Sequence, residues 1–170
     1  MWVGSANAAL ITTFDDVTAD SSTPFVSGGL FFTSTNGLAW NTSGGSSNNG
    51  TQALIIGFDG SVTITRDGGG LFSIDSLDAG LSWYTALTSF DLNVGSEIIT
   101  LGNGYSPHSF SSLTNLTSLV ISPGPSDGYI AIDNINWSEA DATVVPEPAS
   151  LALLGLGLAG LGFSRKKRTS

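Results

Sequence analysis

The chain has 170 residues, a formal net charge of −9 and no cysteine, which excludes disulfides, thiolate metal sites and cysteine nucleophiles. Residues 1–145 hold 13 acidic side chains and a single base, Arg66, so this part carries a net charge of −12. It cannot neutralise phosphates, so we expect no nucleic-acid partner.

The first eight residues are predicted to be the remnant of a signal peptide. Ala6-Asn7-Ala8 fits the A-x-A pattern at which signal peptidase cleaves. Only five residues precede this pattern, and they contain neither a basic region nor an apolar run. We therefore expect that the natural protein starts further upstream and that signal peptidase is a partner during export.

Residues 9–143 are predicted to form one all-β domain. Runs of strand-forming residues recur about every ten residues, with turns rich in Gly, Ser and Asn between them, and no stretch shows a helical period. The number and spacing of the runs predict an antiparallel β-sandwich of the jelly-roll type. The expected strands are Leu10–Phe14, Gly29–Thr33, Gln52–Gly57, Ser61–Thr65, Leu71–Ile74, Ser82–Leu87, Glu97–Leu101, Leu116–Ile121 and Tyr129–Ile132.

Two of these strands are expected to pair as a hairpin. Ser61–Thr65 alternates strictly between polar and apolar residues, and Arg66–Gly70 is rich in glycine. The sequence therefore predicts that Leu71–Ile74 folds back onto Ser61–Thr65.

The last predicted strand, "YIAIDNINW", changes its parity midway. Ile130 and Ile132 share one face, whereas Ile135 and Trp137 have the opposite parity. A bulge at Asp133-Asn134 would bring all four side chains to the same face. We also expect the first and last strands to lie side by side, as they do in jelly rolls.

The body resembles the galactose-binding-like and MAM-like jelly rolls. It opens with Phe14-Asp15-Asp16, contains the segment Phe72–Asp78 and closes with Ile132–Ile135. The resemblance implies a β-sandwich that often binds structural calcium and in some cases sugar.

Three carboxylates are candidate calcium ligands. Asp15 and Asp16 follow the first strand and Asp133 lies in the last, so they would meet at one edge of a jelly roll. Calcium takes six to eight oxygen ligands, which carboxylates and backbone carbonyls supply. The alternative is that Asp15-Asp16 caps a turn while Asp133 accepts backbone hydrogen bonds.

Tyr105 and His108 are candidate glycan contacts. Both are expected in an exposed loop, "GNGYSPHSF", and aromatic rings stack on sugar rings. His108 is the single histidine and cannot build a multi-histidine metal centre. Gly124–Gly128 fits the G-x-S-x-G pattern, but a predicted strand follows it rather than a helix, so we interpret it as a turn.

No catalytic constellation emerges, so we expect a protein that is not an enzyme. One alternative is a secreted hydrolase that acts on glycans through paired carboxylates. A further alternative is an ice-binding protein, although Thr33–Thr35 and Thr63–Thr65 are isolated and form no repeat.

The carboxyl end has three parts in a fixed order. Pro146-Glu147-Pro148 comes first, residues 149–163 are uncharged and predicted to form a transmembrane helix, and Arg165, Lys166, Lys167 and Arg168 follow. Basic residues beside a hydrophobic span stay in the cytoplasm, so the body would lie outside the inner membrane.

This order resembles the PEP-CTERM sorting signal of exported bacterial proteins. The resemblance covers Val145 to Arg168, within a predicted sorting-signal domain of residues 144–170. It implies an exosortase that cleaves near Pro146-Glu147-Pro148. We therefore expect an inner-membrane anchor before processing and a location on the cell surface or in the extracellular matrix afterwards. There the body would associate with exopolysaccharide or bind glycan.

Overall fold

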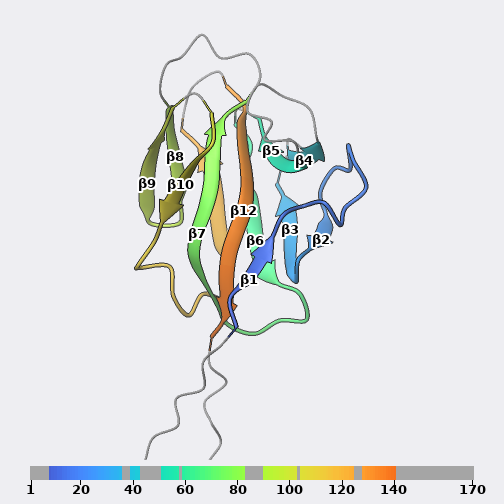
Figure 1. Cartoon of the computed structure of the whole chain (residues 1–170), viewed down its shortest axis with the longest axis vertical. Coiled ribbons are helices and arrows are strands. Elements are labelled where there is room, and N and C mark those ends of the chain that lie inside the picture. Colours follow the sequence, from blue (N-terminus) through green and yellow to red (C-terminus); the bar gives the residue numbers. More distant parts are fainter. Residues whose placement is uncertain are drawn as a thin grey trace, which may run out of the picture. The chain divides into compact units, whose positions relative to one another are not determined.

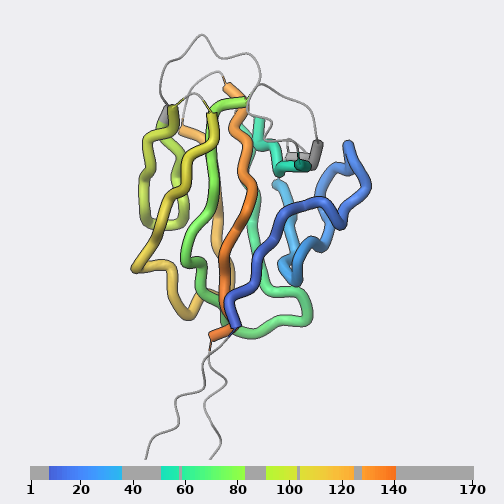
Figure 2. The backbone as a smooth tube through the Cα atoms, viewed as in Figure 1, coloured from blue at the N-terminus to red at the C-terminus, as the bar shows by residue number. Residues whose placement is uncertain are grey.

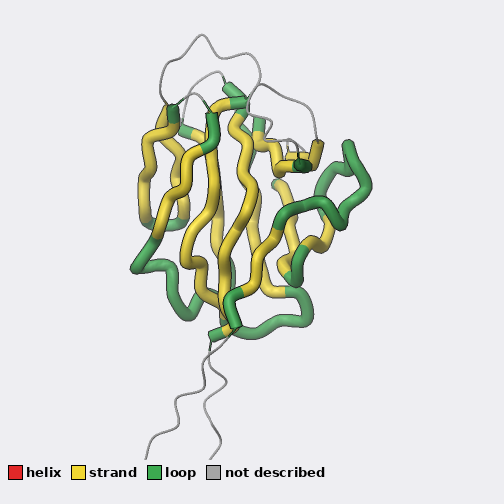
Figure 3. Tube along the Cα trace, in the orientation of Figure 1, coloured by secondary structure: helices red, strands yellow, loops and turns green. Residues whose placement is uncertain are grey.

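The computed structural model describes residues 8–35, 39–42, 51–57, 59–82, 90–102, 104–124 and 128–140. These residues form strands and loops and no helix (Figure 3). None of them belongs to a segment with the length and apolarity of a membrane-crossing helix. The helix predicted in residues 149–163 lies outside the described residues. The chain divides after Ala140, and the fold is that of the part before this point.

Two antiparallel sheets make up the body (Figures 1 and 2). Sheet A has the order β10-β7-β12-β5-β4, with β1 also paired to β12, and sheet B has the order β2-β3-β6-β11-β8-β9. The predicted antiparallel β-sandwich is therefore confirmed. The strands are β1 (Leu10–Thr12), β2 (Phe25–Ser27), β3 (Leu30–Ser34), β4 (Ala39–Thr42), β5 (Ala53–Ile56), β6 (Val62–Arg66), β7 (Phe72–Leu81), β8 (Phe90–Val94), β9 (Glu97–Leu101), β10 (Ser106–Ser109), β11 (Leu119–Pro123) and β12 (Ile130–Glu139).

The first and last strands lie side by side, as the sequence predicts. Leu10 of β1 is the register partner of Trp137 in β12. The predicted bulge is also confirmed, because the β7–β12 register shifts between Asp133 and Asn136. Asn134 adopts a φ of 46° there, a left-handed conformation that asparagine tolerates better than most residues.

The predicted hairpin between Ser61–Thr65 and Leu71–Ile74 is wrong. β6 pairs with β3 and β11 in sheet B, whereas β7 lies between β10 and β12 in sheet A. The glycine-rich turn after Arg66 therefore carries the chain from one sheet to the other. Alternation within a strand predicts which residues face inward, but it does not select the partner strand.

Four strands went unpredicted: β2, β4, β8 and β10. They are three to five residues long, and three of them contain residues that disfavour strands, such as Pro107 in β10. The strand predicted over Ser82–Leu87 falls mostly outside the described residues, and Ser82 lies just past the end of β7.

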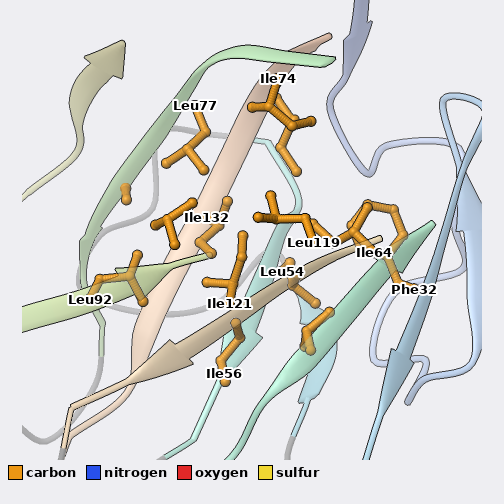
Figure 4. Close-up of a cluster of buried hydrophobic side chains, with 14 of the residues drawn as sticks. Phe32, Leu54, Ile56, Ile64, Ile74, Leu77, Leu92, Leu119, Ile121 and Ile132 are labelled. Carbon is orange, nitrogen blue, oxygen red and sulfur yellow. The ribbon is translucent and has the colours of Figure 1, made fainter. Parts of the chain in front are cut away.

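The inward faces of the two sheets form one hydrophobic core (Figure 4). Along β3, β6 and β11, alternate residues are buried while their neighbours face outward, which is the period-2 pattern of a half-buried strand. Phe14, Phe25 and Phe32 cluster where β1 leads into β2, with ring centroids 5.2 to 6.3 Å apart. This core holds the outward faces of the sheets in fixed positions.

Candidate functional site

Two carboxylates face each other on the outer face of sheet A. Asp78 of β7 is the register partner of Asp133 in β12. Their chain neighbours Ala79 and Ile132 are buried in the core, so the two aspartates project from the opposite face. Directly opposed like charges destabilise a sheet, so other groups at this position must offset the repulsion.

The bulge in β12 supplies part of that compensation. The Asn134 side-chain amide donates to Asp78 Oδ2 at 2.8 Å, and its backbone N–H donates to Asp133 Oδ1 at 2.7 Å. The hydroxyl of Thr51 donates to Asp133 Oδ2 at 2.8 Å. Asp133 is 0% exposed and both its oxygens accept hydrogen bonds, whereas Asp78 is half-buried.

Tyr105 lies beside these carboxylates because β10 approaches β7 unusually closely. Ser106 is the register partner of Ala79, which brings Tyr105 next to Gly80. A Cβ atom at Gly80 would overlap the carbonyl oxygen of Gly104. Only glycine therefore allows the backbone before β10 to reach this position.

The ring of Tyr105 rests on a small apolar base. Together with Tyr129 it packs against Ala53, Ile55 and Ala131, which are buried on the outer side of sheet A. The base fixes the ring against the sheet, and the residue remains half-buried.

Burial raises the pKa of Tyr105, and the charges of Asp133 and Asp78 raise it further. Both causes disfavour the phenolate, so the hydroxyl stays protonated at and well above neutral pH. Tyr105 therefore offers a neutral hydroxyl that donates and accepts hydrogen bonds.

The sequence predicted a loop for His108, but the structure places this residue in strand β10. His108 is the register partner of the core residue Leu77, so its side chain lies on the inner face of sheet A, opposite to Asp78. His108 is half-buried, and its Nε2 lies 3.0 Å from the hydroxyl of Ser106. Burial lowers the pKa of His108, and the opposing effect of Asp78 is smaller. The imidazole is therefore neutral at neutral pH.

Asp78, Tyr105, Asp133 and Asn134 together form what we call the Tyr105 site. It combines an aromatic ring, a neutral hydroxyl and a half-buried carboxylate on a rigid sheet. Such groups bind polar ligands that carry hydroxyl or amino donors.

The structure gives the predicted calcium ligands other contacts. Asp16 accepts hydrogen bonds from the Ser27 hydroxyl and the Gly28 backbone, which fixes the turn between β2 and β3. Asp15 accepts from the backbone N–H of Gln52 at 3.0 Å. Among the described residues, no three Asp, Glu or His side chains gather closely enough to hold a metal ion.

Calcium binding by Asp15, Asp16 and Asp133 stays a prediction. A ligand that binds only the folded state raises the melting temperature, so calcium should raise it and a chelator should reverse the rise. Calorimetric melts in calcium and in chelator test this directly. An unchanged melting temperature would rule out a calcium site in the folded body.

Sequence reasoning found Tyr105 but missed Asp78 and Asn134 as parts of the site, and His108 lies on the other face of the sheet. Asp78 lies 55 positions before Asp133 in the chain, and only the strand register brings them together. The one available signal was the parity change in β12, which located Asn134 at a bulge.

The two threonine segments, which appear isolated in the sequence, lie on neighbouring strands. Thr33 of β3 is the register partner of Thr63 in β6, and the hydroxyls of Thr35 and Ser61 lie 2.9 Å apart. Thr65 is opposite Phe31, so the rank of threonines is interrupted. Ice binding stays an alternative prediction, and this short row of threonines adds no support to it.

The tail residues singled out in the sequence all lie outside the part of the chain that the structure describes. They are Pro146, Glu147, Pro148, Arg165, Lys166, Lys167 and Arg168. Sequence comparison nevertheless identifies the tail, because residues 144–167 match the PEP-CTERM protein-sorting motif. The chain therefore carries this sorting signal, as its three-part pattern predicted. A search of curated proteins found no match.

Several solved β-sandwiches are similar to this chain. A family 22 xylan-binding domain matches at 12% identity with a TM-score of 0.47, over 83% of this chain and 100% of that one. A family 22 carbohydrate-binding module of Clostridium thermocellum matches at 12% identity and a TM-score of 0.45, over 79% and 95%. A family 29 module matches at 14% and 0.44, over 84% and 100%. The likeness concerns the sandwich arrangement alone.

Proposed function

We propose that the chain is an exported bacterial protein whose tail is cut by an exosortase and whose sandwich binds glycan without catalysing a reaction. The observation that carries the sorting part of this proposal is the PEP-CTERM protein-sorting motif at residues 144–167. The tail anchors the chain in the inner membrane before processing. The body then reaches the cell surface or the extracellular matrix, where exopolysaccharide is its partner.

The tail chemistry supports the anchoring step. Residues 149–163 contain no charge and would span ~22 Å as a helix at ~1.5 Å per residue. That length is short for a bilayer core of ~30 Å, but snorkelling basic side chains compensate for such a mismatch. The four bases of residues 165–168 keep the end of the chain in the cytoplasm.

The Tyr105 site supports glycan binding by the body. A sugar ring presents C–H groups on its faces and hydroxyls at its edge. The ring of Tyr105 suits the first, and its neutral hydroxyl and the carboxylate of Asp78 suit the second. The apolar base under Tyr105 limits its motion and so reduces the entropy lost on binding.

The geometry favours binding over hydrolysis. A glycoside hydrolase needs two carboxylates that both reach the scissile bond. Asp78 and Asp133 face each other, but Asp133 is 0% exposed and its two oxygens already accept hydrogen bonds. A substrate would meet only Asp78, so we propose that the body is not an enzyme.

Replacing Tyr105 by alanine should weaken glycan binding about tenfold or more, because truncating an aromatic residue that anchors a ligand typically costs about 2 kcal/mol or more. Tyr105→Phe keeps the ring and should retain most of the affinity. Binding is measured by pull-down with exopolysaccharide from the native host. Ser109→Ala, an exposed position on the strand that follows Tyr105, is the matched control.

Two results of these binding measurements would contradict glycan binding at this site. If the wild-type chain binds none of the host's polysaccharides, the glycan-binding role is contradicted. If Tyr105→Ala binds as well as wild type and melts at the same temperature, glycan binding lies elsewhere on the body.

A further inference from the structure

Positive charge is almost absent from the body. Arg66 is the only lysine or arginine in residues 1–164. Its guanidinium lies 2.7 Å from Glu139, at the end of β12. The single basic side chain of the body is therefore already paired with a carboxylate at one end of the sandwich.

The Tyr105 site lies far from this ion pair. Glu139 is opposite Phe72, and Asp133 is opposite Asp78, so six residues of β7 separate the two positions. At about 3.3 Å per residue this is roughly 20 Å along the strand. At physiological ionic strength, salt largely screens the interaction of exposed charges that are more than about 8 Å apart. The charge of Arg66 therefore does not offset the carboxylates of the site.

Neutral donors hold the carboxylates instead. Asn134 and Thr51 supply the donors to Asp78 and Asp133. The backbone of Gln52, the residue after Thr51, donates to the exposed Asp15, which brings a third carboxylate to this part of sheet A. His108 adds no positive charge at neutral pH, because burial lowers its pKa.

We infer that the Tyr105 site selects glycans that carry protonated amino groups, such as a de-N-acetylated amino-sugar polymer. The inference rests on the proposed glycan binding, because it names the ligand class of the same site. An ammonium group on such a sugar meets Asp78 directly and lies within the negative field of Asp133. The electron-rich face of Tyr105 attracts the same group. The carboxylates of a uronate polymer are repelled by the same negative charges.

Three polymers with related backbones test this inference on the full chain in mild detergent. The probes are a β-1,4-linked glucosamine polymer, its N-acetylated form and a polyuronate, at an acidity where the amines are protonated. The glucosamine polymer should bind roughly tenfold more tightly than its N-acetylated form, and the polyuronate should bind most weakly. Added salt should reduce this advantage.

Asp78→Asn tests the assignment to the site. It keeps the shape and the hydrogen bonding of the side chain but removes its charge. We expect it to lower the affinity for the glucosamine polymer several-fold more than the affinity for the N-acetylated polymer, because only the first polymer carries a charge that Asp78 attracts. Asp91→Asn is the matched control, because Asp91 is an exposed carboxylate on sheet B that accepts from Thr100.

Other outcomes would contradict the charge preference, the assignment to the Tyr105 site or glycan binding itself. Equal binding of the acetylated and de-acetylated polymers overturns the charge preference but leaves glycan binding intact. Equal loss in Asp78→Asn and Asp91→Asn shows attraction by the whole acidic body and overturns the site. Polyuronate binding that needs calcium and disappears in chelator reverses the preference. Binding to none of these polymers or to the host's polysaccharide contradicts the proposed function itself.

Discussion

Replacing Pro146, Glu147 and Pro148 together by alanine should abolish processing of the carboxyl end in the native host. The two prolines fix φ near −65° and keep the preceding residues extended, so an enzyme meets an open backbone before the hydrophobic stretch. Alanine removes this restriction, favours helix and deletes the carboxylate of Glu147. Intact mass spectrometry should find the whole tail on the variant, and its loss near Glu147 on the wild type.

A change immediately upstream provides the control for this experiment. Thr143→Ala lies just before the sorting motif and should be processed like the wild type. The same spectra report the amino end, where removal after Ala8 is expected. A triple variant that is still cut at the same bond would show that the enzyme does not require Pro-Glu-Pro, and would contradict the proposed role of these residues.

The tail was predictable because its meaning depends on local order. Two prolines, an uncharged stretch and a basic end act in sequence, and the motif match at residues 144–167 confirms that interpretation. The sandwich was predictable for a related reason. Alternation along Ser61–Thr65 shows which side chains are buried whatever strand lies beside them, and Val62 and Ile64 are indeed in the core.

Partner strands were not predictable in the same way. Leu71–Ile74 follows Ser61–Thr65 after a turn that suits a hairpin, yet the chain crosses to the other sheet. Phe72, Ile74 and Leu77 fill the core from the sheet opposite β6, so the burial pattern is the same for either arrangement. Only the packing of the whole sandwich decides between them.

The Tyr105 site was half-predictable. Tyr105 and His108 stood out because they lie in a polar segment with Gly and Pro, but the structure places His108 in β10 rather than in a loop. The carboxylates that set the electrostatics of the site come from distant strands. Asp78 and Asp133 become neighbours through pairing of β7 with β12, which no local pattern encodes.

Trp137→Ala should be the most damaging single substitution in the body, with a loss of about 3–5 kcal/mol in the free energy of unfolding. Trp137 is 1% exposed and belongs to the core, and its backbone pairs with β1 on one side and β7 on the other. Its ring also closes against Gly29 at the turn between β2 and β3, where an added Cβ would lie 3.0 Å from the ring. Removing the indole would therefore leave a cavity between the two sheets.

Trp137→Phe separates the packing of this residue from its polar atom. The indole Nε1 is buried without a hydrogen-bond partner among the described residues, and such a group carries a desolvation cost of roughly 1–3 kcal/mol. Phenylalanine removes that atom and keeps most of the ring, so its loss should be well below that of alanine. Chemical unfolding followed by circular dichroism measures both, with Ser138→Ala as the neighbouring control. A phenylalanine variant as unstable as the alanine variant would mean that Nε1 contributes a favourable contact, and that the indole is held by more than its hydrophobic surface.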